Sequence, residues 1–536
     1  MITKNEHLKS ASSTLAGTIA TSLGDPSTDR FNTDDDYFLK FHGIYQGDDR
    51  DVRKTSTKHY QFMVRTKLPA GILAAAQYLA CDEFADHHSN GTLRITSRQD
   101  LQFHGVVKTR LGPLVKAIND ALLTTFGGGG DVHRNVMAPP TPTQSHVVEE
   151  VLVDVRRVSD AVLPRTPAYH AIWVEGVQLD LNNDFTDPLY GKTYLPRKFK
   201  TAFAVPPLND VDIFSNDLGF VAIIESDRLV GYNVLTGGGL GMSHNNPATF
   251  PRLADVLGFV EPDFLVVVTH ALVGIHRDFG DRSNRKHARL KYVLAEKGAD
   301  WCRAELERRL GFKLQQARPF SFTKQGDLFG WHRQLDGRWF LDLYVESGRI
   351  KGELKAAVCE VVSRFKTEVR LTPSQNLLLV NVAPADRDAI TKLLVAHITP
   401  SALRRDSMAY VALPTCGQAI AEAERFFSSL LDKLEHVLEE LGLQNDEITL
   451  RLTGCPDGCV RSYTAKIGLV GKSVGLYQIY IGGNGVNTRL NRLYKENVKA
   501  ADLVGVLRPL LVRYAQERAG GERFGDWAAR ALEFPQ

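Results

Sequence analysis

Apolar and polar residues alternate along this chain in patterns that predict both helices and strands. From Ala419 onward, apolar positions recur at helical spacing and stop at Gly442, which predicts a helix ended by a glycine cap. Next, Ile448, Leu450 and Leu452 alternate with polar residues, which predicts a strand leading into a glycine-bracketed loop. Because strands and helices also alternate elsewhere, the pattern predicts the α+β class or the α/β class.

Two stretches of the sequence repeat each other. The segment RITSRQDL at residues 94–101 returns as RLTPSQNL at residues 370–377. Each copy leads into a short alternating strand, Leu101 to Val107 in the first and Leu377 to Val382 in the second. The repeat predicts a duplicated supersecondary unit.

A second echo links GYNVLTGG at residues 231–238 with GLYQIYIGG at residues 475–483. Chance similarity between strand–turn segments is the alternative, but the two echoes keep the same order along the chain. We therefore expect a pseudo-two-fold architecture with a cofactor between two related halves.

Length and composition narrow the class of protein. The chain has 536 residues, which at roughly 150 residues per domain predicts three to four domains. Hydrophobic residues make up 43% and charged residues 24%, values that exclude an acidic disordered chain and a collagen-like one. The net charge of +3 is too small to indicate a nucleic-acid partner. An anionic ligand must therefore meet a local basic cluster.

No segment has the features of an export signal or a membrane span. Residues 1–36 are polar and rich in Ser, Thr and Asp, which predicts a disordered arm ahead of a fold that starts near Tyr37. This arm also lacks a basic stretch followed by an apolar core. The longest apolar run, Phe264 to Ile275, contains His270 and is shorter than the roughly 20 residues that a membrane helix needs. We therefore expect a cytoplasmic protein that binds no membrane.

The six cysteines are too few for a disulfide framework, so we expect reduced thiols. Three of them, Cys81, Cys302 and Cys359, are expected to be unrelated buried residues. Cys416 comes at the start of the predicted helix, where free N–H groups and the helix dipole favour a thiolate. Cys455 and Cys459 lie on the glycine-bracketed loop, which can point two sulfurs toward one centre. Without the paired Cys-x2-Cys knuckles or histidines of a zinc site, iron–sulfur is the favoured chemistry.

Longer motifs surround these cysteines. They are SMAYVALPTC at residues 407–416, AEAER at 421–425, TGCPDGC at 453–459, GLVGK at 468–472, TRL at 488–490 and FGD at 524–526. Upstream lie FHGIYQ at 41–46, FHG at 103–105, HRNV at 133–136 and YLPRKFK at 194–200. Together they resemble the siroheme and 4Fe-4S nitrite and sulfite reductase family, and within it the assimilatory sulfite reductase hemoprotein (beta) subunits. The resemblance extends over roughly residues 37–530.

The resemblance implies an α+β fold with pseudo-two-fold duplicated ferredoxin-like units and two α/β domains that bind siroheme and the cluster. The expected units are a polar N-terminal arm at 1–36, a first ferredoxin-like half at 37–140, a first siroheme-binding domain at 141–320, a second ferredoxin-like half at 321–400, and a 4Fe-4S and siroheme-binding domain at 401–536.

The resemblance also assigns roles to individual residues. Siroheme is edged with carboxylates and sulfite is a dianion, so both need Arg and Lys donors. The residues at the family's positions for holding sulfite and supplying protons are Arg65, Arg134, Lys198 and Lys200. Those at its siroheme-binding positions are Arg94, Thr96, Arg98, Gln102 and His104, with Cys459 bridging the siroheme iron and the cluster. The basic run at residues 281–291 is either an ordinary helix face or a further contact to siroheme carboxylates.

One position departs from the family. Four cysteines hold the cluster there, and the first of these falls on Tyr410, which is six residues before Cys416. A phenol has a pKa of about 10 and is a poorer iron ligand than a thiolate. Three alternatives stay open: Cys416, Cys455 and Cys459 hold the cluster with Tyr410, water or another donor at the fourth iron; the cluster is unstable or lacks that iron; or the cluster is lost and the activity changed.

The implied activity is the six-electron reduction of sulfite to sulfide, in assimilatory sulfate reduction and cysteine biosynthesis. No Gly-x-Gly-x-x-Gly motif opens a helix after a strand, so we expect electrons from a separate NADPH-dependent flavoprotein, with ferredoxin as the alternative donor. Siroheme nitrite reductase is the main rival, but the resemblance leads us to expect a neutral side chain at Lys200 in such enzymes. Because of Tyr410, a siroheme-binding protein without turnover is the other alternative.

Overall fold

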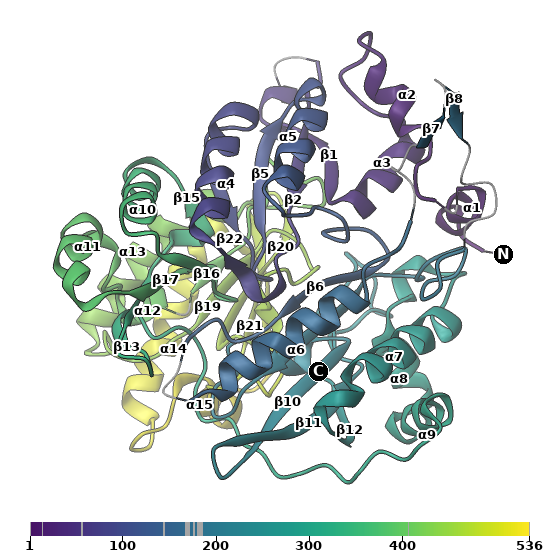
Figure 1. Cartoon of the computed structure of the whole chain (residues 1–536). Helices are drawn as coiled ribbons and strands as arrows, with labels where there is room; N and C mark the ends of the chain where they lie inside the picture. Colours follow the sequence, from purple (N-terminus) through teal and green to yellow (C-terminus); the bar gives the residue numbers. More distant parts are fainter. Residues whose placement is uncertain are drawn as a thin grey trace.

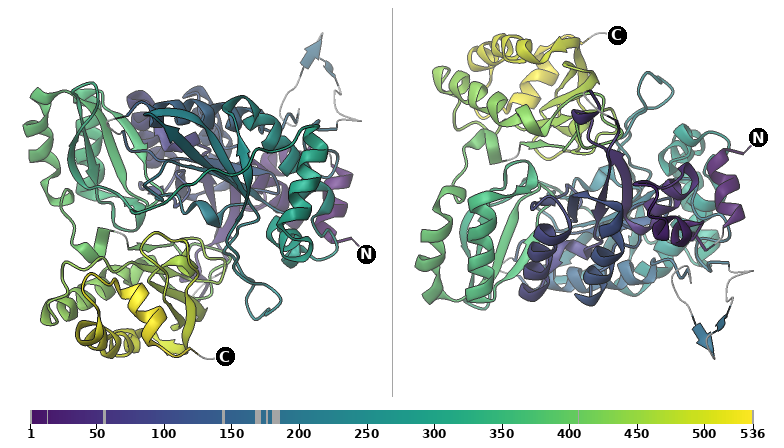
Figure 2. Two further views of the ribbon diagram at one scale, coloured as in Figure 1. Left: turned by 90° about the horizontal axis from the view of Figure 1, so that it is seen from below. Right: turned by 90° about the horizontal axis from the view of Figure 1, so that it is seen from above.

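Four five-stranded sheets organise the part of the chain that the structure describes. The computed structural model describes residues 2–12, 14–54, 57–142, 145–166, 172–174, 177–179, 186–405 and 407–534. A two-stranded pair, β7 (Ile172–Val174) and β8 (Val177–Leu179), completes the sheets of these residues. Figure 1 shows helices packed around the sheets. In Figure 2 the chain after residue 400 forms a lobe of its own.

Two of the sheets exchange their edge strands. The first has the order β1-β2-β5-β4-β15 and the second β13-β14-β17-β16-β3. Their bounds are β1 Ile44–Asp48, β2 Tyr60–Arg65, β4 Leu93–Ile95, β5 Leu101–Val106, β15 Arg349–Ile350, β13 Gly330–Arg333, β14 Trp339–Leu343, β17 Leu377–Val382, β16 Glu368–Leu371 and β3 Ile72–Leu73. The late strand β15 pairs with β4 and the early strand β3 pairs with β16, so neither sheet is complete without the other. The strands predicted after each copy of the repeat, β5 and β17, are confirmed.

The repeated turn has the same internal bonds in both copies. The hydroxyl oxygen of Thr96 accepts from the backbone N–H groups of Arg98 and Asp100, both at 3.1 Å. Its counterpart Thr372 accepts from Ser374 at 3.2 Å and Asn376 at 3.0 Å. These short side-chain bonds explain why a threonine stands at the same place in each repeat. The predicted pseudo-two-fold relation between the two units is confirmed.

The other two sheets also match each other. Their orders are β12-β11-β10-β9-β6 and β18-β19-β20-β21-β22. Their bounds are β6 His133–Met137, β9 Phe199–Ala204, β10 Leu218–Glu225, β11 Arg228–Thr236, β12 Asp255–Val260, β18 Met408–Ala409, β19 Leu450–Thr453, β20 Ile467–Ser473, β21 Leu476–Ile481 and β22 Arg492–Lys499. In each sheet the first three strands in chain order run parallel and the last two are added antiparallel. We call the units around these sheets the first and the second α/β unit.

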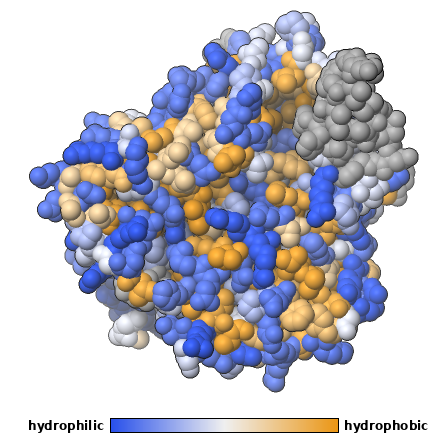
Figure 3. Space-filling view, viewed as in Figure 1, coloured by the Kyte–Doolittle hydropathy of each residue, from blue (hydrophilic) through white to orange (hydrophobic). Residues whose placement is uncertain are grey.

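Helices cover the sheets, and most buried apolar residues lie between helix and sheet. The longer helices are α4 Ala75–His88, α5 Lys108–Asp120, α6 Val147–Ala161, α7 Leu265–Phe279, α8 Leu290–Lys297, α9 Ala299–Leu310, α10 Gly352–Phe365, α11 Arg387–Leu394, α13 Glu424–Glu440, α14 Leu503–Glu517 and α15 Phe524–Ala531, and the single turn α12 is Ala402–Arg405. Most of the long apolar run lies in α7 and packs into the core. None of the helices in the described residues is both long and apolar enough to span a membrane. On the face shown in Figure 3, hydrophilic and hydrophobic residues are interspersed.

The helix predicted from Ala419 starts later than its apolar spacing indicated. Helix α13 begins at Glu424, and Gly442 follows its end with a φ of +68°, as expected for a glycine cap. The N–H groups of Ile420 and Ala421 instead donate to the carbonyl of Gly454, at 2.9 and 3.0 Å. This pairing with the loop after β19 keeps residues 419–423 out of the helix, so the prediction of its start was wrong.

The prediction of a disordered N-terminal arm was also wrong. The arm forms α1 (Lys4–Ala11), α2 (Ile19–Gly24) and α3 (Thr33–Leu39) and packs on the first ferredoxin-like unit and the first α/β unit. Lys9 is 0% exposed, and its ammonium donates to a Glu6 carboxylate oxygen at 2.6 Å and to the carbonyl of Leu195 at 2.7 Å. The polar composition of the arm gave no sign of this packing, because Leu195 lies 186 residues away along the chain.

Candidate active site

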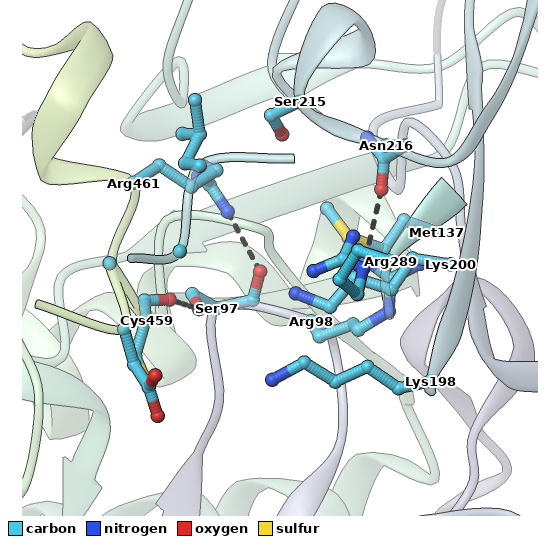
Figure 4. A pocket seen from close by; sticks show the side chains of 14 residues that line it. Ser97, Arg98, Met137, Lys198, Lys200, Ser215, Asn216, Arg289, Cys459 and Arg461 are labelled. Atoms are coloured by element: carbon cyan, nitrogen blue, oxygen red, sulfur yellow. Dashed lines mark hydrogen bonds between the residues drawn. The ribbon is translucent and has the colours of Figure 1, made fainter. Parts of the chain in front are cut away.

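A basic pocket lies where the first ferredoxin-like unit meets both α/β units. About 480 Å³ of space lies between its lining residues, part of it open to solvent. Its charged and thiol-bearing lining includes Arg98, Lys198, Lys200, Arg289, Cys459 and Arg461. Figure 4 shows the lysines with Arg98 and Arg289 toward one side and Cys459 with Arg461 toward the other. The pocket therefore joins cations of the first half of the chain to a thiol of the second half.

The two lysines reach the pocket because of strand alternation. Phe199 begins β9 and is buried against the His133 ring, with 5.5 Å between the ring centroids. Side chains on a strand alternate between faces, so Lys198 and Lys200 both point away from Phe199. Within the described residues, neither ammonium makes a hydrogen bond or ion pair with protein. The sequence prediction that these lysines face a common site is consistent with their position in the pocket.

The protein surroundings make both lysines ready proton donors. Burial, followed by Arg197, lowers the pKa of Lys198 to about 8, while Asp457 acts in the opposite direction. Burial, followed by Lys198 itself, holds the pKa of Lys200 well below its usual value. A bound anion would stabilise the charged form of each lysine and so raise both pKa values part of the way back.

Arg65 and Arg134 converge on one backbone carbonyl in the glycine run 127–130. Each donates to the carbonyl of Gly128 at 3.2 Å, and Arg134 also donates through Nε to Gly130 at 3.0 Å. A Cβ atom at Gly129 would lie 2.0 Å from the carbonyl oxygen of Lys40, so only glycine fits there. Burial opposes the charge of Arg65, but Tyr45, Tyr410 and Asp100 raise its pKa.

Gln102 and His104 lie behind Arg65 on the neighbouring strand β5. With its amide oriented to match its neighbours, Gln102 accepts from Arg65 Nη2 at 2.6 Å and Nε at 3.0 Å. Its amide nitrogen donates to His104 Nε2 at 3.2 Å. Burial, reinforced by nearby arginines, holds the pKa of His104 well below its usual value, so the imidazole is neutral. Its Nδ1 is buried and has no protein partner in the described part of the chain.

Arg94, Thr96 and Arg98 have structural partners of their own. Arg94 is fully buried and donates to a Glu424 carboxylate oxygen at 2.5 Å and to the carbonyl of Ala409 at 2.8 Å, which ties β4 to the second α/β unit. Thr96 holds the repeated turn. Arg98 donates to Asn135, Asn216 and Thr201 at 2.7–3.0 Å, and burial lowers its pKa to about 9. Their predicted siroheme contacts come in addition to these bonds.

The three thiols of interest lie close to the pocket but not at a helix start. The N–H group of Cys416 donates to the carbonyl of Ala412 at 2.8 Å, in the loop that precedes α13. The expectation that a helix dipole stabilises its thiolate was therefore wrong. Burial raises the pKa of each thiol, that of Cys459 to about 12, although Lys198 and Lys200 oppose the rise at Cys459. All three are free thiols.

Tyr410 lies beside these thiols. Its N–H group donates to the carbonyl of Leu452 at 3.1 Å, which places it next to β19 and the loop of Cys455. The Arg94 guanidinium carbon lies 5.5 Å from the centroid of the phenol ring. Burial, with Cys459 and Cys416 nearby, raises the pKa of Tyr410 above its usual value. In the part of the chain that the structure describes, no three of His, Cys, Asp and Glu converge on a single metal ion.

The basic run at residues 281–291 is not an ordinary exposed helix face. Arg285 pairs with Asp131 at 2.6 Å and Arg289 pairs with Asp217 at 2.8 Å. Arg289 also lines the pocket, and its role toward siroheme carboxylates stays a prediction. Sequence reasoning missed Arg461, which pairs with Asp212 and donates to the carbonyl of Ser97 at 2.8 Å. Its position two residues after Cys459 was the available signal.

These residues fit a carboxylate-edged macrocycle and an iron–sulfur cluster. Arg94 Nε and His104 Nδ1 are buried without a hydrogen-bond partner in the described residues, and the ammonium groups of Lys198 and Lys200 face the pocket. A ring of carboxylates would satisfy the cations among them. The three thiols supply the soft donors that iron–sulfur clusters bind. At the fourth position the side chain is a phenol, so the fit to the cluster rests on three thiols.

Two family models match the chain. The model described as nitrite and sulphite reductase 4Fe-4S domain matches residues 129–314. The model described as nitrite/sulfite reductase ferredoxin-like half domain matches residues 53–121 and again 332–397, which confirms the duplicated ferredoxin-like units. The 4Fe-4S match covers the first α/β unit and leaves Cys416, Cys455 and Cys459 outside it.

Close relatives align over nearly the whole chain. The sulfite reductase [NADPH] hemoprotein beta-component of Myxococcus xanthus is 49% identical over 544 residues, covering 99% of this chain and 96% of that protein. The protein of the same name from Anoxybacillus flavithermus is 46% identical over 541 residues, covering 98% and 95%. Among solved structures, the Mycobacterium tuberculosis NirA protein superimposes with a TM-score of 0.84 at 24% identity, covering 99% of this chain and 97% of that one, and so has the same fold.

Proposed function

The chain belongs to the nitrite and sulfite reductase family, and from that premise we propose that it reduces sulfite to sulfide with six electrons. The observation that carries the proposal is the pair of partnerless ammonium groups, Lys198 and Lys200, in the same pocket as Cys459. The pathway we propose is assimilatory sulfate reduction leading to cysteine biosynthesis, in the cytoplasm.

The chain's own residues bind the anion and hold protons. Arg65 and Arg134 supply guanidinium groups fixed by the Gly128 carbonyl, and such groups bind oxyanions with directed hydrogen bonds. Lys198, with a pKa of about 8, holds a proton at neutral pH that it can release to an oxygen of the substrate. Lys200 adds a second ammonium, which suits the dianion sulfite better than the monoanion nitrite.

Siroheme and a 4Fe-4S cluster, when bound, would supply the iron centre and the electron path. The residues that would hold siroheme are Arg94, Thr96, Arg98, Gln102 and His104. Cys416, Cys455 and Cys459 would hold the cluster, with Tyr410 at the fourth ligand position, and Cys459 shares the pocket with the two lysines. The five-unit division of the chain is part of this proposal, although β6 lies before residue 140 and, by pairing with β9, belongs to the sheet of the first α/β unit.

The electron donor we propose is an NADPH-dependent flavoprotein. Both relatives are named as the beta-component of an NADPH enzyme, which supports a separate partner that handles NADPH. Ferredoxin is the alternative donor.

The test is sulfide formation by protein purified without oxygen. Siroheme, iron and acid-labile sulfide are measured first, and then sulfide is measured with sulfite and reduced methyl viologen. Sulfide formation supports the proposal, whereas full cofactor content without sulfide supports a binding protein without turnover. Nitrite is tested in parallel, and a higher kcat/KM for nitrite than for sulfite would favour the nitrite reductase alternative. Adding the flavoprotein with NADPH, or reduced ferredoxin, then identifies the donor.

A further inference from the structure

Tyr45 lies among three of the four residues expected to handle the substrate. The Arg65 guanidinium carbon lies 5.2 Å from the centroid of its ring. The Arg134 side chain is within hydrogen-bond reach of its hydroxyl, and Lys198 is close enough to act on its charge. Neither the repeat nor the cysteine pattern pointed to this residue, although it belongs to the FHGIYQ motif at residues 41–46.

The fold leaves the Tyr45 hydroxyl little freedom. On strand β1, Tyr45 lies opposite Met63 of β2, and the Arg65 N–H donates to the carbonyl of Gly43 at 2.9 Å. A Cβ atom at Gly129 would lie 2.7 Å from the Tyr45 hydroxyl oxygen, so the hydroxyl rests against the bare backbone of the glycine run. The same run accepts hydrogen bonds from both arginines, so the phenol and the two guanidinium groups share one fixed support.

The charges that act most strongly on Tyr45 are positive. They come from three elements: Arg65 on β2, Arg134 on β6 and Lys198 just before β9. Burial would raise the pKa of Tyr45, but these cations lower it to about 8. The buried tyrosines Tyr78, Tyr190 and Tyr463 show the opposite, because burial raises the pKa of each. A phenol like that of Tyr45 releases its proton near neutral pH more readily than an ordinary tyrosine does.

Building on the proposed sulfite reduction, we propose that Tyr45 is a further catalytic residue whose hydroxyl donates a hydrogen bond, and then its proton, to an oxygen of the bound sulfite. In that step the phenol O–H bond breaks and the proton joins the sulfur-bound oxygen. A second proton, from Lys198, lets this oxygen leave as water when the S–O bond breaks. The two electrons for that cleavage come from the electron donor, so Tyr45 is neither oxidised nor reduced. The phenolate, stabilised by the two arginines, regains a proton from solvent.

The experiment compares Tyr45→Phe with Tyr60→Phe in protein loaded with its cofactors. Tyr60 is a matched control because it lies on the same hairpin and also has an arginine, Arg30, 5.2 Å from its ring centroid. With methyl viologen as reductant, we expect kcat of Tyr45→Phe to fall by about a hundredfold, at the lower end for loss of a general acid. KM for sulfite should change much less, and Tyr60→Phe should match the wild type.

A second readout does not depend on turnover. The ultraviolet difference spectrum of tyrosinate should show one tyrosine ionising near pH 8 in the wild type and in Tyr60→Phe, but not in Tyr45→Phe. If Tyr45→Phe loads its cofactors poorly, 3-fluorotyrosine at position 45 keeps the shape of the ring and lowers its pKa. The alkaline decline of kcat should then move to lower pH.

The outcomes separate this inference from the proposed function. Equal kcat and KM in Tyr45→Phe and Tyr60→Phe, at equal siroheme and iron content, would overturn the role of Tyr45 and leave sulfite reduction standing. A fall in affinity for sulfite without a fall in kcat would also overturn proton donation. If the wild type forms no sulfide, the proposed sulfite reduction is wrong, and the role of Tyr45 in that reaction is wrong as well.

Discussion

The loops that follow β9 and β19 occupy equivalent places in the two α/β units but carry different chemistry. Thr201 of β9 pairs with Leu218 of β10 as Leu450 of β19 pairs with Ile467 of β20. Asp210 follows Thr201 by the same number of residues as Cys459 follows Leu450, so Asp210 and Cys459 occupy equivalent positions in the two units. Asp210 is buried, and burial raises its pKa to about 8.

The next residues show that the two copies still share one backbone. Asp212 and Arg461, at equivalent positions, have φ values of +49° and +58°, and each precedes a short 3-10 helix. These two residues also form an ion pair across the pseudo-two-fold relation. The turn is therefore the same in both units, but their functional groups differ. The first unit has lysines at β9, and the second has thiols in the loop after β19. Neither copy alone makes the pocket.

The largest effect that tests this division is expected for Cys459→Ser. The change removes the thiol that shares the pocket with the lysines and is proposed to bind the cluster. Loss of a residue that only supports a metal ligand lowers activity by up to about a hundredfold. Loss of a proposed ligand should therefore lower sulfide formation by at least about a hundredfold. Asp210→Asn, at the equivalent place in the first unit, should keep its activity. Sulfide production with methyl viologen, at measured iron and siroheme content, checks both. Equal losses in the two variants would mean that the loops are not chemically distinct.

Lys198→Met tests the other half of the comparison. A charge-assisted hydrogen bond contributes about 1.5–3 kcal/mol, so kcat/KM for sulfite should fall by at least about tenfold. Because the pKa of Lys198 is lowered to about 8, its proton is held below that pH and lost above it. Wild-type activity should therefore decline as pH rises through about 8, and the decline should be shallower in the variant, where Lys198 no longer contributes and only groups such as Tyr45 and Lys200 still titrate.

The control is Glu447→Gln, since Glu447 stands in the second unit where Lys198 stands in the first. We expect this variant to keep the wild-type pH profile. A profile in Lys198→Met identical to the wild type would show that Lys198 supplies no proton in the rate-limiting step.

Short-range patterns predicted the fold well, and long-range partners limited the prediction of the site. The two repeats and the alternation of Ile448, Leu450 and Leu452 at β19 are patterns of the sequence itself, so they could be read from spacing. The true start of α13 could not be read in this way, because the N–H groups of Ile420 and Ala421 donate to the carbonyl of Gly454, in the loop after β19. The three thiols could be grouped by their motifs, but Tyr45 acquires its character only from cations on three other elements, which no local pattern contains.

Tyr410→Cys and Tyr410→Phe test whether three thiols are enough to hold the cluster in the second α/β unit. A fourth thiolate should bring the iron content to about four per siroheme and slow the loss of the cluster in air. Tyr410→Phe removes the phenol oxygen and should lower the iron content below that of the wild type. Iron and acid-labile sulfide in protein kept without oxygen measure both changes. If all three proteins hold the same iron and lose it at the same rate, Tyr410 does not face the cluster.

The smallest effect concerns the N-terminal arm, which Lys9 joins to the first α/β unit through Leu195. Lys9 is buried with Glu6 and lies 4.0 Å from Asp131, the carboxylate that pairs with Arg285 behind the pocket. Lys9→Met leaves buried acceptors without their cation. We expect a loss of about 2 kcal/mol, below the roughly 3–5 kcal/mol for a wholly unpaired buried charge, because Arg285 still pairs with Asp131.

Thermal unfolding of the loaded protein, followed by circular dichroism, measures this loss, with Lys4→Met as the control. Lys4 pairs with Asp34 at 2.7 Å on the surface, where its side chain is 67% exposed, and such pairs contribute about 0–1 kcal/mol. Lys9→Met should therefore unfold several degrees earlier than Lys4→Met. Equal unfolding temperatures would show that the buried contacts of Lys9 add no more stability than an exposed surface pair does.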